Sequence, residues 1–580
     1  MQNLSGGYVL HKTSPILHGM FAHTSGLPGQ PISERDLMAT NRLQATAWGL
    51  NRGVLGVARD LLAQTSTMFE PRGRWPIARP DEGENPVPPR TLLGAPERTE
   101  EARWNAMSDE EKRRVRAGNA RIYKANDARR GRRMVFEKAM ETAYFMEEHP
   151  RFYFVWLHDF RLRRYIHAAG GLTPQGSDIQ KSLMHFADGV PLGKTGYYWL
   201  CIRAANCYGL DKLPLDDRFA WADSNAELFA AIAADPLKWE RWWVRGDNGK
   251  AVEEPWGFLA TALEMAQAQR AQHREDFVSH LPCPLDGTCN GLQHLSAMGL
   301  DPIGARATNL LAGLERQDCY EEVAKLAREI VARDAAKGVP EAVVWYGHVN
   351  RGTVKRTVLA TPYGITEGGI QKGLIEEGVV PESDLDIRKT SAYFRDVLVD
   401  ALSGTVVAAK NIMAWIQVCA TRMGEAGLPM DWTTPMGSRC RQAYHETERK
   451  LVRTLTGRVV LHEEIPDGRI DAGKQAMGSA PQIVHSFDAA HMAATINMCA
   501  EQQGIRDFAM IHDSYGVHCG HTTALSAILR QTFVEQYRVN QLERLAEDFR
   551  AQAPGVDIPE PPARGTLDIE QVHSAEFFFS

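Results

Sequence analysis

The sequence predicts a mostly helical fold that mixes α and β structure (α/β, in the α+β arrangement). Several long segments place apolar residues at the spacing of an amphipathic helix, and only a few short runs have the alternation or aromatic content of strands. With 44% apolar and 24% charged residues, the 580-residue chain has the composition of an ordinary globular protein with a large core. Its length alone corresponds to about four structural units.

Charge and cysteine usage exclude several classes of protein. The net charge of −6 and the pI of about 6.4 give no global basic field, although a local basic stripe can still bind nucleic acid. The nine cysteines form no CxxC pair and no zinc-type cluster, which indicates reduced thiols. No apolar run reaches membrane-spanning length, and the first residues lack the pattern of a signal peptide. We therefore expect a soluble, cytoplasmic protein without membrane contact.

The N-terminal quarter alternates irregular and helical segments. Residues 1–35 are rich in turn residues and are expected to form an irregular lead-in, and helical spacing follows from about 34 to 64. Residues 70–96 are loaded with proline, glycine and charge, which predicts an exposed loop. Residues 108–149 predict a long polar helix or a pair of helices.

A dense basic run lies within that polar helix. Eleven lysines and arginines fall between Lys112 and Lys138, and acids are nearly absent from Arg113 to Met134. This pattern favours a face that contacts phosphates, and the alternative is a solvated face balanced by nearby glutamates.

A second basic segment follows a short aromatic run. Phe152–Trp156 predicts a strand, which leads into Asp159, Arg161, Arg163 and Arg164. These side chains could hold a nucleic-acid backbone or pair with local acids. Residues 172–250 then mix loops and helices.

That mixed region offers little chemistry of its own. Lys212 is, on its own evidence, an ordinary surface lysine. The tryptophans are expected in the core or at an interface: Trp199, Trp221, Trp239, Trp242 and Trp243.

Asp286 stands at the end of a predicted strand. Residues 278–285 have strand character, Gly287 follows the aspartate, and NGLQHLSAM then opens a helix. A carboxylate at a strand end, backed by a glycine turn, can approach a metal ion without obstruction by its own backbone. The alternative is an aspartate that caps the helix or forms a turn.

A cationic helix is predicted at residues 350–364, after another helix at 316–337. Arg351, Lys355 and Tyr363 fall within one stripe of this helix, and Gly364 is a candidate C-cap. The stripe resembles a surface that grips a triphosphate. A solvated basic helix with an aromatic anchor is the alternative.

The last third combines helices with two β-rich segments. Residues 380–427 are predicted helical, and 432–477 predict a β-rich excursion with Arg439 and Arg441 at its base, either a groove reader or an insertion. In Asp507–Cys519, two short strands flank His512 and Asp513, so that Asp513 lies at a hairpin tip. The C-terminal AEFFFS is expected to dock onto the protein.

Three motifs resemble those of a known family. LDGTCNGLQHLSAM, RxxxKRxxxxxxYG from Arg351 to Gly364, and IHDSYG stand in the order of the signature motifs of the single-subunit RNA polymerases of bacteriophages and mitochondria. The resemblance runs from about Asn41 to the aromatic end, through DFRLRRY, PQGSDIQK, YYWLCIRAANCYGLDKLP and VHSFDAAH. Gly287 and Ser514 separate the chain from the related DNA polymerases, which carry other residues at these two places.

The resemblance implies a right-hand polymerase fold and two-metal catalysis. Asp286 and Asp513 would hold two Mg²⁺ ions, with the backbone carbonyl of Gly287 as a further ligand. Lys355 and Arg351 would cradle the β- and γ-phosphates, and Lys355 would donate a proton to pyrophosphate.

Further residues acquire roles by the same resemblance. Lys212 matches a second lysine that contacts the triphosphate, and Tyr363 with His485 would sense the ribose 2′-hydroxyl. Arg163 matches a residue near the template–RNA hybrid, and Tyr320 one near the insertion pocket.

Two departures from the family pattern affect this expected site. Leu162 replaces the usual glycine, so the backbone there could be placed differently. Pro362 should bend or end the helix before Tyr363, which bears on the geometry of ribose sensing.

The expected function is DNA-directed RNA synthesis, with DNA template, nascent RNA and NTPs as partners. A second polypeptide or an opened template is expected to be needed for promoter-specific initiation, because the chain begins where the family's N-terminal domain should end. The alternatives are a primase or DNA polymerase of the same fold and a non-catalytic nucleic-acid-binding subunit. If phage-encoded, the chain would act in the cytoplasm of the infected cell.

The resemblance also divides the chain into expected regions. They are a lead-in (1–41), a helical thumb (42–149), the first part of the palm (150–303), fingers (304–485) with a specificity-type hairpin at about 432–477, and the second part of the palm with a C-terminal foot (486–580).

Overall fold

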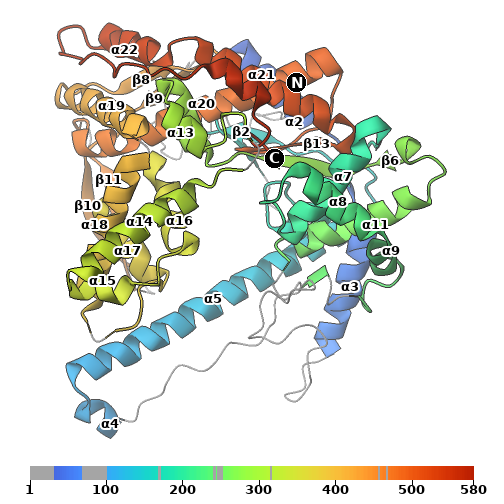
Figure 1. Cartoon of the computed structure of the whole chain (residues 1–580), viewed down its shortest axis with the longest axis horizontal. Coiled ribbons are helices and arrows are strands. Elements are labelled where there is room, and N and C mark those ends of the chain that lie inside the picture. The colour runs from blue at the N-terminus through green and yellow to red at the C-terminus, as the bar shows by residue number, and fades with distance from the viewer. Residues whose placement is uncertain are drawn as a thin grey trace.

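The computed structural model describes most of the chain and confirms a mostly helical α+β fold (Figure 1). The described residues are 32–67, 101–167, 171–239, 243–244, 252–313, 316–383, 385–405, 407–454, 457–465 and 468–580. The predicted lead-in up to residue 31 and the predicted loop at 70–96 lie outside them.

A three-stranded antiparallel sheet lies at the centre of the molecule. Its strands are β7 (Pro282–Asp286), β12 (Ala509–Ile511) and β13 (Ser514–His518), in the order β12–β13–β7. The two strands predicted around His512 and Asp513 are therefore confirmed. The predicted strand at 278–285 is instead divided into β6 (Val278–Ser279) and β7. Two prolines in β7 lack an N–H, which an edge strand tolerates because it pairs on one side only.

Three helices and the C-terminal segment pack around this sheet. They are α7 (Gly193–Tyr208), α20 (Ala472–Gln503) and α21 (Thr522–Arg538), while α12 (Asn290–Gly299) follows β7 in the chain. The ring of Phe579 lies 5.2 Å from the ring of Tyr515 on β13, edge to face. Phe577, Phe578 and Phe579 are each at most 3% exposed, so the predicted docking of the C-terminal end is confirmed.

The N-terminal part supplies helices and one short strand. α2 (Glu34–Ala45) and α3 (Arg52–Thr67) are separated by β1 (Trp48–Leu50), which pairs with β4 (Met184–Phe186). The helical spacing at 34–64 therefore located both helices and missed the strand between them.

The predicted polar helix is one continuous helix. After α4 (Glu101–Ala106), α5 runs from Asp109 to Met146 over 38 residues. It begins at a capping box, in which the side chain of Ser108 accepts from the backbone N–H of Glu111 while the Glu111 side chain accepts from the backbone N–H of Ser108. Figure 1 shows it as a long rod that crosses the molecule from α4 toward α3 and α11.

A helical lobe on the left of Figure 1 carries the predicted cationic helix. Trp345 and Phe394 stack inside it with ring centroids 3.8 Å apart. Its members are α14 (Cys319–Ala336), α15 (Pro340–Trp345), α16 (Arg351–Ala360), η2 (Thr361–Tyr363), α17 (Glu367–Glu376), α18 (Ile387–Thr405) and α19 (Val407–Glu425). The helices predicted at 316–337 and 380–427 are confirmed, the latter as two.

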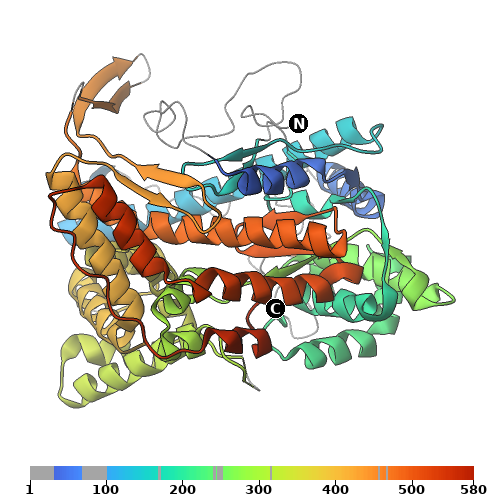
Figure 2. The same cartoon turned by 90° about the horizontal axis from the view of Figure 1, so that it is seen from above.

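The β-rich excursion consists of two antiparallel pairs. β8 (Met430–Thr433) pairs with β9 (Arg439–Gln442), and β10 (Thr447–Thr454) pairs with β11 (Gly457–Glu464). The second pair projects from the body of the protein, at the upper left of Figure 2. The predicted excursion ran to residue 477, but α20 already begins at Ala472.

The aromatic run before the basic segment forms less strand than expected. β2 (Trp156–His158) begins at its last residue and pairs with β3 (Arg164–Ile166), while Phe152 makes only an isolated bridge to Trp48. The other elements are α6 (Asp178–Ser182), β5 (Val190–Pro191), α8 (Leu215–Ser224), α9 (Ala226–Ala234), α11 (Pro255–Arg270), η1 (Arg274–Asp276), α13 (Pro302–Ala307), η3 (Cys519–His521), α22 (Gln541–Gln552) and η4 (Ile569–Ser574).

Two bulk expectations can be compared with the structure. All nine cysteines are free thiols. Among the described residues, no single helix is long and apolar enough to cross a membrane, and the one pair that passes this test together, Ile387–Gly404 with Val407–Glu425, is bent by 103°.

Candidate active site

Asp286 and Asp513 lie side by side at the ends of paired strands. In the register of β7 and β13, Asp286 is directly opposite Ser514, the neighbour of Asp513. The backbone N–H of Gly287 donates to the backbone carbonyl of Asp513 at 3.2 Å. Both aspartates are exposed residues at the protein surface, although the surrounding protein partly desolvates their carboxylates.

The two carboxylates lie in a field that disfavours their negative charge. Desolvation raises the pKa of Asp513 to about 6, and the negative charges of Asp488 and Asp286 add to this effect. Desolvation also raises the pKa of Asp286, and the charges of Glu254 and Asp211 act in the same direction. The site therefore has an excess of negative charge, which a bound cation would relieve.

A cavity of about 370 Å³ opens beside Asp286. Both basic and acidic side chains are among the residues that line this cavity. Lys181 pairs with Glu254 at 2.6 Å, and Arg316 donates to the backbone carbonyl of Asp211. These charged groups of the cavity lining are thus held in place before any ligand binds.

The donor set fits a hard divalent cation that keeps other ligands. Among the described residues, no three His, Cys, Asp or Glu side chains gather closely enough to form a metal cage. Two adjacent carboxylates suit Mg²⁺, which usually binds one or two protein carboxylates together with water and substrate phosphates. Gly287 completes the turn, and a Cβ added there would lie 3.1 Å from Gln293 Oε1 and from the Phe579 ring.

The cationic helix is real but shorter than predicted. α16 begins after Asn350, whose side chain accepts from the backbone N–H groups of Gly352 and Thr353. It ends at Ala360, and Thr361–Tyr363 continue as a 3₁₀ turn. The early end agrees with the expected effect of Pro362. Gly364 caps the turn in the left-handed conformation, with φ of 72°, as predicted.

Arg351 is held at the start of this helix. Its Nε donates to Oδ2 of Asp318 at 2.6 Å, and its guanidinium lies 4.9 Å from the centroid of the Tyr320 ring. Tyr320 is 8% exposed, so it forms a buried platform beneath the cation. Nη1 and Nη2 of Arg351 are not used in the bond to Asp318.

Lys355 and Lys212 both act on carboxylates that line the cavity. Lys355 is exposed and makes no hydrogen bond or ion pair within the described part of the chain. Burial raises the pKa of Glu253, and the positive charge of Lys355 acts against that rise. Lys212 pairs with Asp211 and is 51% exposed. Glu253 and Asp211 line the cavity together with Asp286, so each lysine interacts with a carboxylate of the cavity wall. Lys355 itself lines a separate hollow with Arg356 and Leu359. The side chain of Tyr363 is outside what the structure describes.

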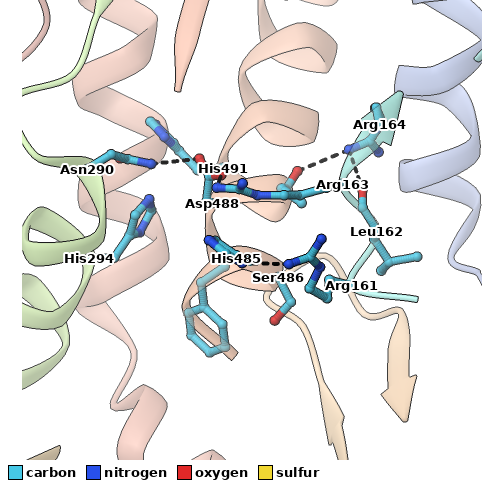
Figure 3. A network of polar contacts seen from close by, with 12 residues as sticks. Arg161, Leu162, Arg163, Arg164, Asn290, His294, His485, Ser486, Asp488 and His491 are labelled. Atoms are coloured by element: carbon cyan, nitrogen blue, oxygen red, sulfur yellow. Dashed lines mark hydrogen bonds and ion pairs between the residues drawn. The ribbon is translucent and has the colours of Figure 1, made fainter. Parts of the chain in front are cut away.

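Arg163 belongs to a buried network rather than to an open surface (Figure 3). Its Nη2 contacts Oδ2 of Asp488 at 2.6 Å, and Nδ2 of Asn290 donates to Oδ1 of the same carboxylate at 2.8 Å. Asp488 is 1% exposed. This carboxylate ties the segment after β2, the helix that follows Asp286, and α20 to one another.

The turn between β2 and β3 places Arg161 and Arg163 on this network. Leu162 adopts the left-handed conformation with φ of 67°, which glycine adopts at less cost. Oδ1 of Asp159 accepts from the backbone N–H groups of Arg161 and Arg163 at 2.9 and 3.1 Å. Arg161 then reaches His485 on α20, with Nη1 at 2.8 Å from Nδ1.

Sequence reasoning missed Asp488 and Asn290. Asp488 follows His485 by three residues, a spacing that places both side chains on one face of a helix and could have identified it. Asn290 is the first residue of α12, four residues after Asp286, and no sequence pattern indicates that its side chain bonds to Asp488. Arg439 and Arg441, expected at the hairpin base, both lie near Asp431, at 3.1 and 3.5 Å.

A family model and several curated proteins are similar to this chain. The family described as DNA-dependent RNA polymerase matches residues 190–557, more than half of the sequence. A mitochondrial DNA-directed RNA polymerase 1 of Nicotiana sylvestris is 33% identical over 554 residues, which cover 93% of this chain and 52% of that protein. The mitochondrial DNA-directed RNA polymerase 1 of Arabidopsis thaliana is 32% identical, covering 95% of this chain and 54% of its own length.

Two further matches cover most of this chain. A chloroplastic DNA-directed RNA polymerase 3B of Nicotiana tabacum is 30% identical and covers 99% of this chain and 57% of its own length. The chain thus spans about half the length of the curated relatives it matches. Among solved structures, the POL domain of Pol1 from M. smegmatis matches with a TM-score of 0.39 and 11% identity, over 87% of this chain and 67% of that one.

Proposed function

Since the chain belongs to the DNA-dependent RNA polymerase family, we propose that it synthesises RNA on a DNA template from nucleoside triphosphates. One observation carries the proposal. Asp286 and Asp513 occupy paired strand ends beside a cavity whose walls hold fixed cations. No specific observation favours a primase, a DNA polymerase or a non-catalytic subunit.

Asp286 and Asp513, with the backbone carbonyl of Gly287, are the proposed ligands of two Mg²⁺ ions. When bound, Mg²⁺ would activate the 3′-hydroxyl of the RNA and neutralise charge on the triphosphate. Both carboxylates must be ionised to serve as ligands. Because the pKa of Asp513 is raised to about 6, this side chain is only half ionised near pH 6 in the metal-free protein, and metal binding should strengthen as the pH rises above that value.

The cationic side chains are proposed to bind the triphosphate. Arg351 would present Nη1 and Nη2 to phosphate oxygens while its Nε stays on Asp318. Lys355 would contact the same phosphates and donate a proton to the leaving pyrophosphate. Lys212 would add a third positive charge, in exchange for its contact with Asp211.

The remaining residues are proposed to read the sugar and the hybrid. Tyr363 and His485 would sense the ribose 2′-hydroxyl, Arg163 would lie near the template–RNA hybrid, and Tyr320 near the insertion pocket. The burial of Arg163 and Tyr320 favours an indirect contribution, through Asp488 and Arg351 respectively.

The regional assignment also stays a proposal. It divides the chain into a thumb (42–149), a palm in two parts (150–303 and 486–580) and fingers (304–485) that include the hairpin at about 432–477. The exposed cations on β10 and β11 support a role of that hairpin in DNA contact.

Partner and compartment are likewise proposed. A requirement for a second polypeptide or an opened template predicts activity on premelted or single-stranded DNA and little on a closed duplex promoter. Full activity of the purified chain on a closed promoter would refute that requirement.

The relatives are named as mitochondrial or chloroplastic proteins. The bacteriophage origin and the cytoplasm of an infected cell therefore stay predictions, which localisation in the source cell would test.

Primer extension tests the proposed activity. With an RNA primer on a DNA template, NTPs and Mg²⁺, the wild-type chain should extend the primer, and Asp513→Asn should abolish extension while template binding in a gel-shift assay is retained. A faster reaction with dNTPs than with NTPs would instead identify a DNA polymerase. If neither the wild type nor Asp513→Asn extends the primer, and both bind the template normally, the chain is a non-catalytic subunit.

A further inference from the structure

The Arg161 guanidinium joins a carboxylate to the ring of His485. Its Nε and Nη2 donate to Oδ2 of Asp159 at 2.8 and 2.5 Å. Its Nη1 lies 2.8 Å from Nδ1 of His485, as Figure 3 shows. The Arg161 side chain is 12% exposed and that of Asp159 is 8% exposed, so the arrangement is largely shielded from water.

The chemistry of arginine determines which nitrogen of His485 carries the proton. A guanidinium can only donate hydrogen bonds, so Nδ1 of His485 must accept. A neutral imidazole has one donor and one acceptor nitrogen, and therefore the proton is on Nε2. Burial and the positive charges of Arg163 and Arg161 lower the pKa of His485 to about 2, so the ring is neutral at physiological pH.

The contact spans segments that are far apart in sequence. Arg161 comes from the turn between β2 and β3, and His485 from α20. The turn itself is fixed, because Asp159 accepts from two backbone N–H groups and Arg163 is tied to Asp488 on α20. Arg161 therefore approaches the ring from a support that does not depend on the ring.

We propose that Arg161 is a positioning residue that holds His485 as its Nε2–H tautomer, in one orientation, for recognition of the ribose of the incoming nucleotide. The role in ribose recognition rests on the proposed function, but the assignment of the tautomer does not. A donor that is fixed in advance recognises a 2′-oxygen without reorganisation, whereas a deoxyribose offers no oxygen there.

A purely structural role for Arg161 is the competing explanation. In that case the pair with Asp159 would only stabilise the β2–β3 turn, and the ring of His485 would keep its tautomer without it. The two explanations predict different tautomers of His485 and different sugar selectivity in Arg161→Met. They predict the same loss of overall stability, because the variant loses the ion pair with Asp159 in either case.

NMR of the full chain decides the tautomer without reference to activity. In protein labelled with ¹⁵N-histidine, long-range ¹H–¹⁵N correlation should show His485 with an unprotonated Nδ1 and a protonated Nε2, assigned by comparison with His485→Asn. Arg161→Met should convert this pattern to an average of both tautomers. A protonated Nδ1 in the wild type, or an unchanged pattern in Arg161→Met, would overturn the assignment.

Single-nucleotide incorporation measures the consequence for selectivity. The ratio of kcat/KM for NTP over dNTP should fall about three- to tenfold in Arg161→Met, the range expected for one neutral hydrogen bond. Arg161→Lys keeps a donor and should retain more of the ratio. In a His485→Ala background, Arg161→Met should have no further effect, because Arg161 acts through that ring.

A matched control is available on the surface. Arg151 also pairs with an aspartate, Asp188, but both side chains are more than half exposed and lie on other elements. Arg151→Met should leave the ratio unchanged. Equal losses in Arg161→Met and Arg161→Lys, or an additive loss in the His485→Ala background, would overturn the role in selectivity. A wild-type chain without any synthesis would refute the proposed function, while the NMR would still decide the tautomer.

Discussion

The backbone N–H of Gly287 donates to the backbone carbonyl of Asp513 at 3.2 Å, which joins two segments from opposite halves of the chain. Each segment carries one of the two exposed aspartates. Because the bond is between backbone atoms in a sheet, the spacing of the carboxylates is set by strand pairing and not by their mutual attraction. The pair can therefore remain together despite like charge.

The first prediction concerns stability, pH and Mg²⁺. The pKa of Asp513 is raised from its ordinary value to about 6, so the ion-free folded protein loses stability as pH rises from about 4 through 6. At pH 7.5 without divalent ions, Asp513→Asn should increase the free energy of unfolding by about 1 kcal/mol, a value reduced for solvent screening because the carboxylate is exposed. Mg²⁺ should stabilise the wild type and not the variant.

Denaturant unfolding at pH 4 and pH 7.5, with and without Mg²⁺, measures this effect. The exposed Asp217 on α8 provides the control, and Asp217→Asn should change neither the pH dependence nor the response to Mg²⁺. A destabilising effect of Asp513→Asn at pH 7.5 would contradict the raised pKa.

The second prediction concerns the buried carboxylate of Asp488. Asp488→Leu leaves Arg163 and Asn290 without their shared acceptor, and should lower the free energy of unfolding by about 3 kcal/mol, as expected for the loss of one partner of a buried pair. Asp488→Asn keeps an acceptor and should cost less. Chemical denaturation at pH 7.5 measures both.

The control for Asp488 is the exposed pair of Arg151 and Asp188. Asp188→Asn should lower the free energy of unfolding far less than Asp488→Leu does, because an exposed ion pair contributes little. Equal costs at the two sites would show that the network around Asp488 does not depend on its charge.

The third prediction separates the charge of Lys355 from its proton. Lys355→Arg keeps a positive charge for the triphosphate but cannot release a proton, so KM for NTPs should change little while kcat falls about 10²- to 10⁴-fold. Lys355→Met should also raise KM. Lys372→Arg on α17, a highly exposed lysine that pairs with Glu376, should leave both constants unchanged. Steady-state primer extension gives these constants, and an unaltered kcat in Lys355→Arg would exclude the role of proton donor.

The fourth prediction concerns the projecting hairpin. Arg449, Arg453 and Arg458 are exposed on β10 and β11, and their replacement by glutamine should weaken binding to promoter DNA and reduce its salt dependence. Extension of a preformed primer should be unchanged, because the hairpin projects from the body of the protein (Figure 2). Fluorescence anisotropy at several salt concentrations, beside primer extension, measures both. A loss of extension as large as the loss of binding would place these residues in the catalytic site instead.

Long periodic segments were predictable from the sequence, and short strands were not. α5 and α14 agree with their helical patterns because each pattern extends over many residues. β1 is only three residues long and carries no periodicity of its own, and its existence depends on pairing with β4. The division between β6 and β7 likewise depends on which neighbours each strand finds.

By itself, the sequence determined the order of the motifs, the residue types that carry the chemistry, and the end of α16 before Pro362, since these follow from local chain properties. Only the tertiary structure decided that Asp286 and Asp513 stand on adjacent strands, that Asp488 collects Arg163 and Asn290, and that Arg161 meets His485. Hydrogen bonds and charge interactions act over a few ångströms, and nothing in a linear pattern states which distant segments will come within that range.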